Sequence, residues 1–127
     1  MKHNIETELF KNANVEGIET DFPLIAVMAR KNNYEGLTLH YLKVKGETVS
    51  MAIVNPDSNG KAKICAIETT LKHRRNGYGT ALLQYLVSEY PRITALALRE
   101  VVGFYVRSLF RIVADRGGQI IEVETAI

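Results

Sequence analysis

The segment that most constrains the fold is residues 74–80, Arg-Arg-Asn-Gly-Tyr-Gly-Thr, which joins an apolar, strand-like run to a strongly helical one. Its glycines can adopt dihedrals that other residues avoid, so they can turn successive N–H groups toward one anion. The first N–H groups and the positive dipole end of the following helix also favour an anion. Arg74 and Arg75 add forked donors that match phosphate oxygens. The segment therefore predicts a phosphate cradle.

A glycine turn with solvated arginines before a helix would have the same residues as a phosphate cradle. The order of the neighbouring elements favours the phosphate cradle. After the cradle, apolar residues recur at helical spacing until Pro91 ends the helix: Leu82, Leu83, Leu86, Val87 and Tyr90. Residues 93–98 form a short apolar run that suits a buried strand. Strand, crossover helix and strand then make a right-handed parallel unit, with the cradle at the carboxyl end of its first strand.

The region before the cradle predicts three antiparallel strands. Residues 38–45 and 47–54 have strand character and flank a tight reversal at Lys45-Gly46, which indicates a hairpin. Residues 55–60, Asn-Pro-Asp-Ser-Asn-Gly, are a concentrated turn signal, and a third strand follows over residues 61–69. We expect three side chains to share one side of that strand: Ala62, Ile64 and Ala66.

The two ends of the chain have weaker patterns. Residues 18–31 have loosely helical spacing, and Pro23 divides them into one or two short helices. A second helix is expected over residues 99–109, with Gly103 lowering its regularity. Residues 110–113 and 119–123 predict a closing hairpin. The whole pattern predicts one domain over residues 1–127 of class α/β (α+β), with a mixed, mostly antiparallel sheet and one parallel strand-helix-strand unit.

Composition narrows the class of partner. The chain has 46% hydrophobic and 24% charged residues and a formal charge of +2, which is too small to imply nucleic acid. Residues 1–36 carry a net charge of −2 (four Lys/Arg, six Asp/Glu), and residues 37–127 carry +4 (twelve and eight). The positive charge of residues 37–127 favours an anionic ligand, and the acidic residues 1–36 could face a cationic ligand.

Cys65 is the single cysteine, so we expect a reducing compartment, and the apolar run around it indicates packing rather than a nucleophile paired with His40 or His73. The N-terminal residues have no signal-peptide core, and no stretch is long and apolar enough to span a membrane. We therefore expect a cytoplasmic protein. The sequence has no cluster of metal ligands, so no metal cofactor is expected.

The order of elements and residues 74–83 resemble the GNAT superfamily of acetyl-CoA-dependent N-acetyltransferases over roughly residues 38–127. Residues 104–110, Phe-Tyr-Val-Arg-Ser-Leu-Phe, are similar to the late Phe-Tyr segment of that family. This segment departs from the family pattern at Leu109, where the usual residue is Gly, and the common Asn early in the helix is missing. The N-terminal region is short for the family.

The resemblance implies acetyl-CoA as cosubstrate and direct transfer to a primary amine in a ternary complex. The pantetheine arm would pair with the backbone of Ile67, Thr69 and Leu71. The pyrophosphate would lie on N–H groups of the cradle, which begins at Arg74 and continues through Arg75, Asn76, Gly77, Tyr78, Gly79 and Thr80.

The resemblance also implies two catalytic side chains. Glu68 stands where family members commonly place a base, and its structural alternative is a solvated strand-end charge or an ion pair with Lys72 or Arg75. Tyr105 matches the tyrosine that donates a proton to the departing CoA thiolate, and its alternative is a core aromatic with a hydrogen-bonded hydroxyl.

The amine acceptor stays open, as a small molecule or a peptide or protein amine. Several acidic residues would suit a cationic amine, although a solvated surface explains them equally well: Glu6, Glu8, Glu16, Glu19 and Asp21. Tyr34 and Tyr41 could line the acceptor pocket or pack in the core. His40 could face the acceptor cleft or solvent. His73 could contact phosphate or adenine, or it could be an ordinary surface residue.

Two other functions remain as alternatives. The altered late motif could leave a non-catalytic CoA-binding regulatory module. A nucleic-acid surface could be formed by basic residues, although the low net charge argues against it: Lys72, Arg74, Arg75, Arg92, Arg99, Arg107 and Arg111. A P-loop is not supported, because no Lys-Ser or Lys-Thr follows the glycines. A homodimer is conceivable through an exposed sheet edge.

Overall fold

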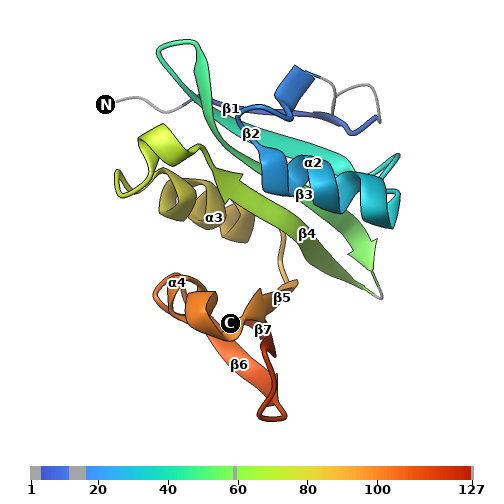
Figure 1. Cartoon of the computed structure of the whole chain (residues 1–127). Helices are drawn as coiled ribbons and strands as arrows, with labels where there is room; N and C mark the ends of the chain where they lie inside the picture. Colours follow the sequence, from blue (N-terminus) through green and yellow to red (C-terminus); the bar gives the residue numbers. More distant parts are fainter. Residues whose placement is uncertain (1–3, 12–16, 59, 127) are drawn as a thin grey trace.

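The seven strands of the computed structural model, which describes residues 4–11, 17–58 and 60–126, form one sheet in the order β1-β2-β3-β4-β5-β7-β6 (Figure 1). The strands are β1 (Asn4–Leu9), β2 (Thr38–Val44), β3 (Glu47–Ser58), β4 (Lys61–Thr69), β5 (Ile93–Leu98), β6 (Phe110–Asp115) and β7 (Ile120–Thr125). Neighbouring strands are antiparallel except β4 and β5, which are parallel. The predicted sheet type is confirmed.

Helices cover both faces of the sheet (Figure 1). Helix α2 (Pro23–Asn32) packs on one face and α3 (Tyr78–Glu89) on the other. Strand β3 contributes to both layers, since Met51 and Ile53 lie in the core under α2 while Ala52 and Val54 lie in the core under α3.

The helix predictions are confirmed in part. Pro23 starts α2 at a first-turn position, where its missing N–H costs nothing, and α3 follows the cradle as expected. The single helix over residues 99–109 is wrong. A 3₁₀ turn, η2 (Arg99–Val101), leads into a five-residue helix, α4 (Val102–Val106). Gly103 and the β-branched residues nearby disfavour a longer helix.

Strand β1 was not predicted. It lies at the sheet edge and pairs with β2 from Asn4↔Lys43 to Leu9↔Thr38. Its alternation is weak because most of its residues are exposed and polar. At the other end, the closing hairpin is confirmed, with its strands extended to Asp115 and Thr125.

The boundary of β3 was also mispredicted. The strand continues through the turn signal to Ser58, since a register shift between Asn55↔Lys63 and Ser58↔Lys61 absorbs the irregular segment. A second shift, from Ile53↔Ala66 to Val54↔Ile64, leaves Cys65 as an extra residue in β4.

The extra residue reverses the side-chain alternation of β4. Ala62 and Ile64 lie in the core under α3, whereas Ala66 packs against the core under α2, so the expectation that all three share one side is wrong. The same reversal turns Glu68 toward α2, where its carboxylate meets the backbone of Ile25.

Candidate active site

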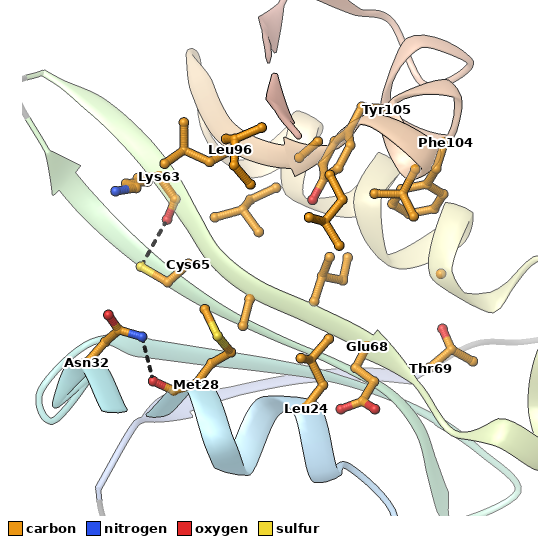
Figure 2. A pocket seen from close by; sticks show the side chains of 18 of the residues that line it. Leu24, Met28, Asn32, Lys63, Cys65, Glu68, Thr69, Leu96, Phe104 and Tyr105 are labelled. Carbon is orange, nitrogen blue, oxygen red and sulfur yellow. Dashed lines mark hydrogen bonds between the residues drawn. The ribbon is translucent and has the colours of Figure 1, made fainter. Parts of the chain in front are cut away.

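A cleft opens where β4 and β5 stop pairing. The ladder joins Ala62–Ile64 to Ile93–Ala95, although β4 continues to Thr69 and β5 to Leu98. The cleft between them measures about 800 Å³ and is lined mostly by apolar side chains (Figure 2). Its lining includes the sequence-predicted site residues Ile67, Glu68, Thr69, Arg74, Gly79 and Tyr105.

The edge of β4 that faces the cleft offers backbone hydrogen-bonding groups. The N–H of Thr70 donates to Val49 O of β3, at 3.0 Å, and the Ser50 hydroxyl donates to Glu68 O, at 3.2 Å. Backbone groups alternate in direction along a strand, so those of Ile67 and Thr69 point away from β3 and toward β5. An extended ligand could therefore add to β4 as a further strand.

Leu71 does not belong to this edge. The strand ends at Thr69, and Leu71 begins the 3₁₀ turn η1 (Leu71–His73) with 78% of its side chain exposed. The expected extension of the strand to Leu71 is therefore wrong, because the chain turns after Thr69 to enter the cradle.

The cradle forms a tight turn that leads into α3. Gly77 is the residue before the helix, with φ of 78°, and Arg75 also has a positive φ of 69°. Asn76 Nδ2 donates to His73 O at 3.2 Å, which closes the turn. Gly79 and Thr80 lie in the first turn of α3, where N–H groups lack intrahelical acceptors. The residues of the predicted cradle thus come together at one helix N-terminus.

Close packing favours Gly at position 79. A Cβ at this position would lie 3.1 Å from Thr69 Oγ1 and 3.5 Å from the Phe104 ring. The absence of a side chain therefore lets α3 approach the end of β4 and brings the cradle next to the open strand edge. Gly77 differs, because its positive φ rather than contact is what favours glycine there.

Arg74 connects the cradle to the cleft. Its Nε donates to Thr69 O at 3.0 Å, and one guanidinium nitrogen lies 3.8 Å from Glu68 Oε2. Arg75, by contrast, is exposed in the turn.

Glu68 is buried, with 8% of the residue exposed, so its interpretation as a solvated strand-end charge is wrong. Its Oε1 accepts a hydrogen bond of 2.9 Å from the N–H of Ile25, in the first turn of α2. Phe22 is the residue before that helix, and its apolar side chain cannot accept a hydrogen bond from the first N–H groups of α2. Glu68, from strand β4, accepts one of them instead. The ion-pair alternative named the wrong partners, since Glu68 lies near Arg74 while Lys72 pairs with Glu47.

Tyr105 lies across the cleft from Glu68 and is 5% exposed. Figure 2 shows its hydroxyl extending into the cleft from the α4 side, while Glu68 and Leu24 lie on the α2 side. Its ring packs between Phe104 and Phe110 at centroid distances of 5.2 and 5.4 Å. Burial raises the pKa of Tyr105 to about 12, so the phenol keeps its proton across the neutral range.

The histidines have structural contacts. His40 is 3% exposed and faces neither solvent nor the cleft, because Nδ1 lies 2.9 Å from Thr7 Oγ1 and Nε2 lies 2.7 Å from the Tyr90 hydroxyl. His73 Nδ1 lies 2.7 Å from Thr70 Oγ1. The His40 ring thus joins β1 to the end of α3, whereas the His73 contact is local to the turn at η1.

Tyr34 and Tyr41, for which the sequence left two positions open, lie in different places. Tyr34 lines the cleft and donates to Cys65 O at 3.4 Å. Tyr41 instead contacts Glu6 and Glu8 of β1, with its hydroxyl 3.4 and 3.1 Å from their carboxylates. Cys65 also lines the cleft, and burial raises the pKa of its thiol, which opposes a nucleophilic role.

Sequence reasoning missed part of the cleft lining. Leu24 and Met28 come from α2, and Leu96 and Leu98 come from β5. Strand alternation could have placed the two β5 leucines on one face, but their exposure depends on the separation of β4 from β5.

Most of the basic residues considered for a nucleic-acid surface lie in ion pairs with carboxylates. Four of the seven considered for nucleic acid are paired, Lys72 with Glu47, Arg74 with Glu68, Arg99 with Asp115 and Arg111 with Glu124. Within the described ranges, no three His, Cys, Asp or Glu side chains are placed to hold a metal ion. The described helices are also too short or too polar to cross a membrane.

Comparison with known proteins identifies the family. The sequence profile of the Acetyltransferase (GNAT) family matches residues 5–109. The chain belongs to the GNAT acetyltransferase family. This GNAT match begins within β1 and so includes the N-terminal region that the sequence resemblance left out. No curated protein sequence matches the chain.

Solved structures share the GNAT fold. An acetyltransferase from Bacillus subtilis in complex with CoA has a TM-score of 0.75 and 12% identity, covering 99% of both chains. The ribosomal-protein-S18-alanine N-acetyltransferase from Escherichia coli has a TM-score of 0.72 and 16% identity, covering 96% of this chain and 93% of its own. The PaiA N-acetyltransferase from Thermoplasma acidophilum, in complex with coenzyme A, has a TM-score of 0.66 and 11% identity over 96% and 98% of the two chains.

Proposed function

We propose that this chain transfers the acetyl group of acetyl-CoA to a primary amine by direct attack in a ternary complex. The main support is the continuity between the open edge of β4 and the cradle. Thr69 is the last residue of that edge, and its Oγ1 lies within van der Waals range of the position where Gly79 would carry a Cβ. One extended ligand ending in a diphosphate could therefore contact both.

The described residues fit such a donor. Backbone groups of Ile67 and Thr69 would pair with the amides of the pantetheine arm. The N–H groups of residues 75–80 would hold the diphosphate at the N-terminus of α3. The apolar cleft lining would exclude water from the thioester, which strengthens polar contacts there. Acetyl-CoA supplies the activated acyl carbon.

Glu68 is proposed as the base. Its Oε1 is held by the N–H of Ile25, so Oε2 would accept the proton from the substrate ammonium, directly or through water. The neutral amine then attacks the thioester carbonyl, forming the C–N bond and breaking the C–S bond. The second nitrogen proton, lost as the amide forms, ends on the sulfur of the CoA thiol.

Tyr105 is proposed to stabilise the departing sulfur. A thiol titrates near ~8.5, so a phenol with a pKa of about 12 is the weaker acid. Complete transfer of the phenol proton is therefore unfavourable, and the main contribution of Tyr105 would be a hydrogen bond to the developing thiolate.

Two measurements test the function. Acetyl-CoA should raise the melting temperature, and amines should trigger release of free thiol. Tyr105→Phe should keep the thermal shift and lower kcat by about tenfold or more, because the ring packing stays while the hydrogen bond to sulfur is lost. Binding of acetyl-CoA without thiol release from any amine would instead indicate a regulatory CoA-binding module.

A further inference from the structure

The α2 side of the cleft is open and apolar. Leu24 of α2, Leu96 and Leu98 of β5, and Ile120 of β7 line the cleft and are 52%, 56%, 46% and 51% exposed. The alanines that alternate with the β5 leucines are buried under α3, so the leucines project from the opposite face, where α2 lies. Three elements thus direct large apolar side chains toward one opening.

The two sides of the cleft have different tasks. The cradle is the N-terminus of α3, on one face of the sheet, whereas Glu68 points to α2 on the other. A donor held by the cradle would approach from the α3 side. The α2 side is then left for the amine and the group attached to it.

Charge in the cleft disfavours a polycation. The charged lining residues are Lys63, Glu68 and Arg74, two cations against one carboxylate. Lys63 lies at the end of the cleft that also contains Cys65 and Leu96 (Figure 2). A second ammonium on the acceptor would lose hydration among apolar side chains and be repelled by Lys63.

The acidic residues near the N-terminus are positioned elsewhere. Glu6 and Glu8 lie on the edge strand β1 and contact Tyr41, and Glu19 pairs with Arg30 on the surface. Asp21 is exposed, and Glu16 lies outside the described residues. Glu6, Glu8, Glu19 and Asp21, the described acidic residues that the sequence suggested for a cationic acceptor, are therefore not among the residues that line the cleft.

We propose that the acceptor is a primary amine with an apolar substituent and no second positive charge. The substituent packs against Leu24, Leu96 and Leu98, and the amine lies toward Glu68. This inference rests on the proposed acetyl transfer, and it excludes polyamines and aminoglycosides as preferred acceptors. The amine is either free or at the head of a peptide with an apolar first residue.

A matched pair of amines tests the inference on the unmodified protein. Hexylamine and 1,6-diaminohexane share the same six-carbon chain, and the diamine adds a second charged amino group at the far end. We expect kcat/KM, followed by thiol release, to be about tenfold or more higher for hexylamine. Equal or reversed values would overturn the inference while leaving acetyl transfer intact, whereas no release with any amine would overturn the proposed function itself. Acetylation of a peptide that begins with Leu would indicate a peptide acceptor rather than a free amine. A peptide that begins with Lys, which has a second ammonium group, should be the poorer acceptor of the two.

A charge reversal tests the role of Lys63. Lys63→Glu should reduce the hexylamine preference by about tenfold, because repulsion of the far ammonium becomes attraction. Arg116→Glu is the matched control, with the same change in charge at an exposed position between β6 and β7. It should keep the original preference. An unchanged preference in Lys63→Glu, with a native melting curve, would overturn the inference.

Discussion

At the scale of single residues, backbone conformation explains an unusual position in the sequence. Leu109 departs from the family pattern, in which this position is usually Gly, and the structure assigns it a φ of 70°. The conformation that normally favours Gly is therefore retained without Gly. Ala126 N–H donates to Leu109 O at 2.9 Å, which ties this strained residue to the segment just after β7.

Leu109→Gly should increase the free energy of unfolding by about 1 kcal/mol, because a left-handed conformation is unfavourable for a residue with a Cβ. The Leu109 side chain is 61% exposed, so little burial is lost. Urea denaturation measures the change. Leu109→Ala keeps the Cβ and should show no such gain, and an equal gain in both variants would contradict the explanation.

Glu68 offers a way to separate capping from catalysis. Glu68→Gln keeps an oxygen that can accept the Ile25 N–H, so stability should hold while kcat falls by about 100-fold through loss of the base. Glu68→Ala removes both functions and should also cost about 1–3 kcal/mol of stability. Melting curves and thiol release measure the two effects. Full turnover by Glu68→Gln would exclude the base role.

At the scale of elements, the contact between β4 and α3 places the cradle. The approach of α3 depends on Gly79, and Arg74 bonds back to the end of β4. The bulge at Cys65 then sets the direction of Glu68. A regular β4 would direct that carboxylate to the α3 side, away from the N-terminus of α2.

Gly79→Ala should weaken binding of CoA by about tenfold or more, because its Cβ would meet Thr69 Oγ1 and displace the first turn of α3. Calorimetry measures the affinity. Gly118→Ala is the control, since its Cβ meets nothing within 4 Å and its φ is not positive. Thr69→Ala added to Gly79→Ala should restore part of the affinity, and a failure to do so would argue against the steric explanation.

At the scale of the whole molecule, partly buried polar contacts join the edge of the sheet to the layers around it. His40 of β2 contacts Thr7 of β1 and Tyr90 at the end of α3. Its ring also meets Tyr85 edge-on. Desolvation lowers the pKa of His40, and Glu89 partly opposes that shift. Folding therefore favours the neutral ring.

The lowered pKa predicts that stability falls as the pH drops below ~6.5, because the unfolded chain then binds a proton that the folded His40 resists. Thermal unfolding between pH 7.5 and 5 should reveal the decline, and His40→Gln should flatten it. Arg99 lowers the pKa of Asp115 and Lys61 lowers the pKa of Glu124. The stability that these two carboxylates contribute is therefore lost at more acidic pH. A flat profile in the original protein would contradict the prediction.

The sequence alone determined several of the local elements and the position of the cradle between β4 and α3. Hydrophobic periodicity, Pro91 and the paired glycines act over a few residues, so the spans of β4, β5 and α3 followed from them. The resemblance to the GNAT family rested on residues 74–83 and on the order of these elements. Only the tertiary structure decided the edge strand β1, the bulge at Cys65 and the capping of α2 by Glu68. These features depend on contacts between residues far apart in the chain, such as Ile25 with Glu68 and Thr7 with His40. Local sequence patterns do not predict such contacts, because strand register and burial depend on the assembly of the whole sheet.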